Sequence, residues 1–170
     1  MEAGAARAHG RAIVRALRRL GDETGSPVLM ETKEGRIRLQ KLVYLLKVGR
    51  YGPAQKFEFN IYQNGPYSPD LTKVYYQYGN RGIAEVPPAT DIPPILVETI
   101  RGADSKGVIF LEALTTALDT TASLRKQAKV GGGLDFGLEW ARSIKPHIGG
   151  PTWREVREFL AAHPDLAAAT

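Results

Sequence analysis

Residues that could carry out catalysis are few in this chain and do not form a catalytic pattern. The three histidines, His9, His147 and His163, lie far apart, and none has the H-x-x-x-H spacing that places two metal ligands on one helix face. The absence of cysteine excludes thiol nucleophiles and cysteine-ligated zinc. Carboxylates are spread along the chain rather than paired as acid and base. The sequence therefore predicts no catalytic residue, no metal site and no cofactor.

A glycine triplet at positions 131–133 could be taken for a phosphate-binding loop. It is followed by Leu134 and Asp135 instead of the Lys-Ser/Thr pair that contacts phosphate and magnesium. The chain also lacks the G-x-S-x-G segment that presents a serine nucleophile. The triplet is better interpreted as a flexible connector between two helices, and we expect a protein that is not an enzyme.

Tyrosine is the residue type whose placement points to a binding function. All seven tyrosines lie between Tyr44 and Tyr78. Tyrosine offers a large amphipathic contact area and is enriched at protein interfaces. We expect the partner-binding residues to be the exposed tyrosines and the cations beside them: Tyr62, Tyr67, Tyr76, Lys41 and Lys73. The predicted partner is another protein.

Within the same segment, Asn64, Gly65 and Pro66 predict a tight turn that leads into a helix. Asn and Gly tolerate positive φ, and Pro fixes the exit from the turn. Ser68, which precedes a proline, is predicted to cap the helix. The turn alone would explain these residue types, with Tyr67 packed over it. The alternative is a rigid corner that presents tyrosines to a partner.

Apolar spacing predicts a mainly α-helical protein with a small β element, an α+β fold in a single domain spanning residues 1–170. The motif core, residues 36–78, holds a two-faced central helix (35–48), a strand (57–61), the turn and a second helix (69–78). Further helices are expected at 5–20, at 95–100 and over the C-terminal region 107–163, where the last is capped by Thr152 through Glu155.

Nucleic acid is the alternative partner. A second strand at residues 83–86 would give the core a winged-helix-like arrangement, and the formal net charge is +5. The residues that would bind nucleic acid are Arg7, Arg11, Arg15, Arg18 and Lys73. The same arginines could instead form the solvated face of a surface helix. Moreover, Lys73 is the one cation in the first turns of the helix after Pro66, where a recognition helix normally carries more.

The overall composition predicts the class of the protein and its location in the cell. Hydrophobic residues make up 43% of the chain and charged residues 24%, as in ordinary globular proteins. No apolar run approaches the roughly 18 residues of a membrane span, so no membrane association is expected. The absence of cysteine fits a reducing cytoplasm, the predicted location.

Two segments of the motif core carry a family resemblance. R-L-Q-K-L-V-Y-L-L (38–46) and F-x-F-x-x-Y-x-x-G-P-Y-S-x-x-L (57–71) resemble the YwgA-like group of bacterial and archaeal proteins, and more distantly the Panacea domain of SocA-like antitoxins. Lys145-Pro146 is a weaker match. Resemblance to the antitoxins implies a non-enzymatic domain that neutralises a toxin by binding it or delivering it to a protease. The longer C-terminal half and the aromatic strand are closer to the YwgA-like group.

Overall fold

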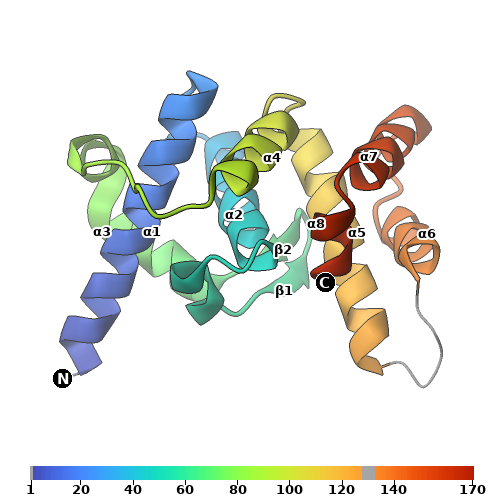
Figure 1. Cartoon of the computed structure of the whole chain (residues 1–170), viewed down its shortest axis with the longest axis horizontal. Helices are drawn as coiled ribbons and strands as arrows, with labels where there is room; N and C mark the ends of the chain where they lie inside the picture. Colours follow the sequence, from blue (N-terminus) through green and yellow to red (C-terminus); the bar gives the residue numbers. More distant parts are fainter. Residues whose placement is uncertain (1, 128–132) are drawn as a thin grey trace.

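The computed structural model describes the backbone of residues 2–127 and 133–170, with side chains described from residue 8 onward except for the same internal gap. It is mainly α-helical with one small antiparallel sheet, as predicted (Figure 1). The glycine connector predicted at 131–133 falls mostly outside the described residues. The helices are α1 (Glu2–Thr24), α2 (Lys33–Val48), α3 (Pro69–Glu85), α4 (Pro94–Asp104), α5 (Val108–Gln127), α6 (Leu134–Ile144), α7 (Gly150–Ala162) and α8 (Pro164–Ala168). A 3₁₀ helix, η1 (Gly52–Lys56), precedes the strands β1 (Asn60–Tyr62) and β2 (Gly65–Tyr67).

Helix α2 is the centre of the fold. Its start is fixed by Thr32, whose side chain accepts a hydrogen bond from the Gly35 amide at 3.0 Å. Leu42 on one face and Tyr44 on the other are both buried, so the predicted two-faced helix is confirmed. It contacts α1, α4, α5 and the β2 strand, which surround it in Figure 1.

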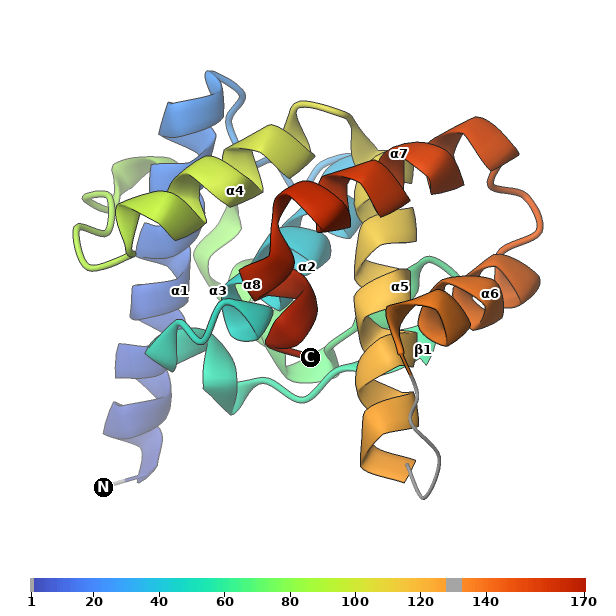
Figure 2. The ribbon, with the colours of Figure 1, turned by 45° about the vertical axis from the view of Figure 1, so that its right-hand side comes forward.

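The buried side chains form one continuous core from Ile13 of α1 to Leu166 of α8. Figure 2 shows α4 crossing above α1 and α2, α7 crossing the upper part of α5, and α6 on the side of α5 that faces away from α1. The C-terminal helices therefore extend the core sideways and leave the α2, hairpin and α3 region open on its own face.

Gly137 allows α6 to pack directly on α5. A Cβ atom at this position would lie 1.9 Å from Thr121 Oγ1 and 2.9 Å from Thr121 Cα. In addition, Thr120 Oγ1 donates a hydrogen bond to the Gly137 carbonyl at 2.7 Å. Because backbone atoms are among those in the way, rotation of a side chain cannot make room for a methyl group.

We therefore expect Gly137→Ala to lower the free energy of unfolding by about 1–3 kcal/mol, the range for overpacking a close contact. Gly150→Ala is the matched control, since nothing lies within 4 Å of a Cβ at Gly150. Urea denaturation followed by circular dichroism measures both. Equal stability of the two variants would show that the contact between α5 and α6 tolerates separation.

Three local predictions are wrong. The strand is shorter than 57–61, because a two-residue loop at 63–64 reverses the chain and leaves only Asn60–Tyr62 paired with Gly65–Tyr67. The strand at 83–86 is absent: the non-helical backbone of Gly79 (φ 66°, ψ 176°) ends the first helical segment of α3, where the helix was predicted to end, but the chain beyond it forms a second helical segment that buries Ile83. The winged-helix-like arrangement depends on that strand. Finally, α7 begins at Gly150, so Thr152 lies inside the helix and caps nothing.

Candidate functional site

The two sequence segments that carry the family resemblance meet in space. The Gln40 side chain of α2 contacts Ser68 in both directions: Nε2 donates to the Ser68 carbonyl at 3.1 Å, and Oε1 accepts from the Ser68 amide at 2.9 Å. Ser68 Oγ in turn accepts from the Leu71 amide, which confirms Ser68 as the cap of α3. Gln40 therefore fixes the point at which the chain leaves the hairpin and enters α3.

Lys41 holds the hairpin itself. Its Nζ donates to the Pro66 carbonyl at 2.6 Å, and its side chain is only 1% exposed. We expected Lys41 on the exposed rim of the site, but the hairpin covers it. Burial lowers the pKa of Lys41 to about 7, against the opposing field of Glu112.

A second buried lysine supports the other end of the hairpin. Lys145 Nζ donates to the Tyr62 carbonyl at 3.1 Å and also to the Gln63 carbonyl. The same Nζ lies 3.3 Å from Oε1 of Glu112, whose side chain is 2% exposed. His147 Nε2 lies 3.2 Å from this carboxylate oxygen. The hairpin thus packs on three buried ionisable side chains, Lys41, Glu112 and Lys145, which come from separate parts of the chain.

Glycine is required at position 65, where the hairpin packs closely against side chains of α2 and α5. Its φ is +86°, and a Cβ would lie 2.8 Å from Thr116 Oγ1 and 3.2 Å from Lys41 Nζ. The predicted turn glycine therefore has two physical reasons: the left-handed backbone and the close contact with α5.

We expect Gly65→Ala to lower the free energy of unfolding by about 1–3 kcal/mol more than Gly25→Ala does. Gly25 is a matched control because it also has positive φ (+63°) but no atom within 4 Å of a Cβ. Thermal unfolding of both variants gives the comparison. Equal losses would mean that only backbone conformation, and not the contact with Thr116, requires glycine.

A pocket of about 300 Å³, here called the tyrosine pocket, opens between α2, the hairpin and α3. Its lining residues are Lys33, Arg36, Ile37, Gln40, Lys41, Tyr62, Gln63, Asn64, Gly65, Tyr67, Thr72, Tyr75 and Tyr76. Three of these described lining residues are cations, four are tyrosines and none is acidic. The pocket is therefore aromatic and positively charged.

The structure brings four of the five predicted partner-binding residues to this pocket: Lys41, Tyr62, Tyr67 and Tyr76. Tyr62 and Tyr76 are 52% and 61% exposed. Tyr67 is partly covered, stacks edge-on against Tyr62 with ring centroids 5.1 Å apart, and accepts a hydrogen bond from Thr72 Oγ1. Tyr67 thus packs over the turn, as one interpretation predicted, and also lines the pocket; its presentation to a partner stays a prediction.

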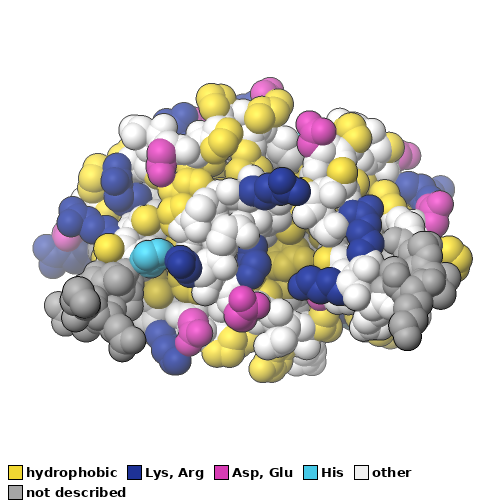
Figure 3. All heavy atoms as spheres, turned by 60° about the horizontal axis from the view of Figure 1, so that its bottom comes forward, with side chains coloured by type: hydrophobic (Ala, Val, Ile, Leu, Met, Phe, Trp, Pro, Cys, Tyr) yellow, Lys and Arg dark blue, Asp and Glu magenta, His cyan; other side chains and the backbone are white. Residues whose placement is uncertain are grey.

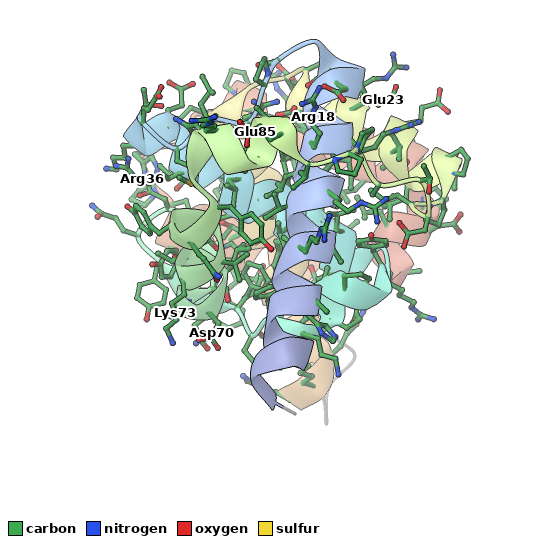
Figure 4. All side chains as sticks on the ribbon, turned by 90° about the vertical axis from the view of Figure 1, so that its left-hand side faces the viewer. Arg18, Glu23, Arg36, Asp70, Lys73 and Glu85 are labelled. Carbon is green, nitrogen blue, oxygen red and sulfur yellow. The ribbon has the colours of Figure 1, made fainter. Side chains whose placement is uncertain are left out.

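Lys73 does not line the pocket. Figure 4 shows Lys73 and Asp70 together at the start of α3, well away from Arg36. Lys73 Nζ lies 2.8 Å from Asp70 Oδ1, and both side chains point into solvent. Asp70 therefore neutralises the one cation of this helix that we had assigned to both kinds of partner.

Sequence reasoning missed the pocket residues Lys33, Arg36 and Tyr75. A signal for the first two was present: the α2 residues of the pocket, Lys33, Arg36, Ile37, Gln40 and Lys41, follow the i, i+3, i+4, i+7, i+8 spacing of one helix face. This helix face is mostly polar, so it lacks the apolar spacing by which a buried face is predicted from sequence. The helical spacing of its polar residues was therefore missed.

No family model, curated protein or solved structure matches this chain. The family resemblance remains an expectation from residues 38–71, and the function has to be argued from the chain's own residues.

On the other side of the hairpin lies a hollow of about 380 Å³. It shares Tyr62, Gln63 and Asn64 with the tyrosine pocket and is completed by Ile61, Ile144, Lys145 and His147. A larger hollow of about 530 Å³ lies between α4 and α8 and contains none of the predicted site residues. The hairpin turn thus lies between two hollows and contributes residues to both.

The arginines of the first helix belong to a different part of the molecule. Arg15 donates to the Pro87 and Pro88 carbonyls at 3.2 and 3.4 Å. Arg18 pairs with Asp22 and also donates to the Ala84 carbonyl. Arg11 is exposed, and the side chain of Arg7 lies outside the described residues. Arg18 thus ties α1 to the end of α3, and Arg15 ties it to the segment that follows.

The distribution of charge also differs from that of a nucleic-acid interface. On the face shown in Figure 3, Lys and Arg side chains are spread across the surface with Asp and Glu among them, rather than gathered in one patch. Among the residues that the structure describes, no three His, Asp or Glu side chains are grouped so as to hold a metal ion. Within the same residues, no helix has the length and apolar character required to cross a membrane.

Proposed function

We propose that this protein is a non-catalytic protein-interaction module that binds its partner through the tyrosine pocket and the adjoining hairpin. The observation that carries the proposal is the convergence of Lys41, Tyr62, Tyr67 and Tyr76 on one pocket. These residues come from three parts of the chain: α2, the hairpin and α3.

The support beneath the hairpin favours a binding role. Lys41 and Lys145 donate hydrogen bonds to the carbonyls of residues 62, 63 and 66. These bonds fix the backbone of the hairpin that carries Tyr62 and Tyr67. A surface that is already in its bound conformation loses little entropy when a partner docks. Exposed tyrosines on such a surface are typical of the few residues that dominate binding energy.

His147 and Glu112 are the pair that comes nearest to a catalytic arrangement. A buried carboxylate beside a half-exposed histidine resembles a base and the group that orients it. Among the described residues that line the adjacent hollow, however, there is no Ser, Thr or Cys to act as a nucleophile. The pair is better explained as part of the hairpin support.

The partner implied by the resemblance to antitoxins is a toxin. Its capture can be tested with tagged protein expressed in the source cells and quantitative mass spectrometry of the bound proteins. The wild type is compared with the double variant Tyr62→Ala/Tyr76→Ala and with Ile95→Ala as a control. Ile95 is 70% exposed, like the tyrosines, but lies on α4 outside the tyrosine pocket.

We expect the wild type and Ile95→Ala to retain a partner protein that the double variant loses by at least tenfold. Two interface tyrosines together contribute about 2–4 kcal/mol, which corresponds to a larger change than this in the dissociation constant. A partner held equally by all three proteins would place the interface elsewhere and contradict the proposal.

Nucleic acid is the less favoured partner, because Arg15 and Arg18 are engaged with backbone carbonyls and Lys73 with Asp70. Binding of labelled DNA and RNA over a range of salt concentrations tests this alternative. Affinity at low salt that falls steeply with added salt and is reduced by Arg11→Glu would favour it over a protein partner.

A further inference from the structure

We infer that the tyrosine pocket receives an acidic segment of the partner, in which a carboxylate lies beside a bulky apolar side chain. This inference rests on the proposed function and adds the chemistry of the ligand to it. It is argued from the charge of the pocket, from its unused hydrogen-bond donors and from the nature of its walls.

The charge of the pocket selects for an anion. Lys41 lies in its floor, with Lys33 and Arg36 toward its rim. Among the described lining residues there is no carboxylate that could neutralise them. Lys33 is exposed, and within the described part of the chain it makes no ion pair or hydrogen bond. A basic segment would meet the charges of Lys33 and Arg36 here, whereas an acidic one would meet only complementary charge.

The unused donors point to the same ligand. The hydroxyls of Tyr62 and Tyr76 have no hydrogen-bond partner among the residues described, and neither does the ammonium group of Lys33. Each of these groups can donate. A carboxylate only accepts hydrogen bonds, so it matches a pocket edge that offers free donors.

The walls favour a carboxylate on an apolar segment over a phosphate group. The surface of the pocket is mainly apolar, and four tyrosines and Ile37 are among the residues that line it, which suits a bulky apolar side chain. Arg36 Nη1 already donates to the Met30 and Glu31 carbonyls at 2.8 and 3.3 Å, so only the Nε–Nη2 edge of this guanidinium is left for an anion. That edge matches the two oxygens of one carboxylate.

Selection from a random seven-residue peptide library displayed on phage tests the inference directly. The full-length wild-type protein is the bait, and the enriched sequences are made as synthetic peptides. We expect these sequences to place Asp or Glu next to Phe, Leu, Ile or Trp. Replacing the acidic residue by its amide, Asp to Asn or Glu to Gln, is expected to weaken binding at least fivefold.

Charge-reversed variants of the protein test the same inference without changing the peptide. Lys33→Glu is expected to weaken binding of the selected peptides about five- to tenfold, while Lys73→Glu, at an exposed lysine outside the pocket, should change binding less than twofold. Both lysines are exposed, so neither change should disturb the fold. Circular dichroism confirms that each variant is folded before binding is measured.

Three outcomes would overturn the inference: no enrichment at all, enrichment of neutral or basic peptides, or equal effects of the two charge reversals. A phosphoserine in place of the acidic residue that tightens binding more than tenfold would also overturn it, in favour of a phosphorylated partner. A partner protein that is lost in Tyr62→Ala/Tyr76→Ala but docks through a neutral segment would leave the proposed function intact and refute only the acidic ligand.

Discussion

Replacing Glu112 by leucine is expected to lower the free energy of unfolding by about 3–5 kcal/mol, the range for removing one partner of a buried ion pair. Glu112 is 2% exposed and Lys145 is 3% exposed, so water cannot take the place of the lost carboxylate. Lys145 would retain its hydrogen bonds to the Tyr62 and Gln63 carbonyls but would carry an uncompensated charge. The hairpin above it should loosen as well.

The double variant Glu112→Leu/Lys145→Met separates the charge effect from simple loss of packing. Removing both charges leaves neither member of this pair as an uncompensated buried ion, so we expect the double variant to be more stable than Glu112→Leu alone. The coupling energy from the complete double-mutant cycle should reach about 2 kcal/mol, measured by urea denaturation. Losses that simply add would show that Glu112 and Lys145 do not act as a pair.

The second large effect is a pH dependence of stability that arises from Lys41. Burial lowers the pKa of Lys41 from 10.5 to about 7 in the folded protein. Between these two values the unfolded chain binds a proton at this lysine that the folded protein does not. Stability therefore rises as the pH increases through this window and is lost again as the pH falls toward 7.

The expected gain is about 1.4 kcal/mol per pH unit well inside the window, and about 2 kcal/mol in total between pH 7 and pH 9. Lys41→Met should lack this gain, because methionine does not titrate, although it also leaves the Pro66 carbonyl without its donor. The measurement is urea denaturation of both proteins at pH 7, 8 and 9. Parallel profiles would mean that Lys41 keeps an ordinary pKa and is accessible to water.

The effect of Lys41 on stability is best measured below about pH 9.5, because tyrosines also affect stability at higher pH. Burial and Asp91 raise the pKa of Tyr51 to about 12, and burial and Asp119 raise that of Tyr44. Both groups keep their protons in the folded protein at pH values where unfolded tyrosine loses them, so they reduce stability above about pH 10. Comparison with Lys41→Met removes these contributions, since both proteins share them.

Much of the fold could be predicted from local patterns. The stripes of Ile13, Leu17, Leu42 and Leu46 predicted buried helix faces correctly, because burial repeats with the helical period. Gly79 shows the limit: the predicted helix end is present, but the local pattern after it fits a strand as well as the second helical segment that forms. That segment buries Ile83 in the core, a tertiary contact that no window of sequence contains.

The candidate site was predicted in part for a similar reason. Exposed tyrosines and a turn are local features, and the structure brings Tyr62, Tyr67 and Tyr76 together. Lys145, by contrast, contacts a hairpin 82 residues earlier in the chain. A lysine so far away carries no sequence signal of the carbonyls it will hold, and the burial of Lys41 beneath the hairpin was hidden in the same way.

Site-specific photo-crosslinking tests the binding role of the tyrosine pocket most directly. The change Tyr76→p-benzoylphenylalanine places a photoreactive group at the pocket, and Ile109→p-benzoylphenylalanine serves as the control, since Ile109 is 53% exposed and lies outside it. The pocket is expected to give a defined protein adduct at position 76 that the Tyr62→Ala change reduces, and none at position 109. An adduct of equal yield at both positions, or at position 109 alone, would contradict the account.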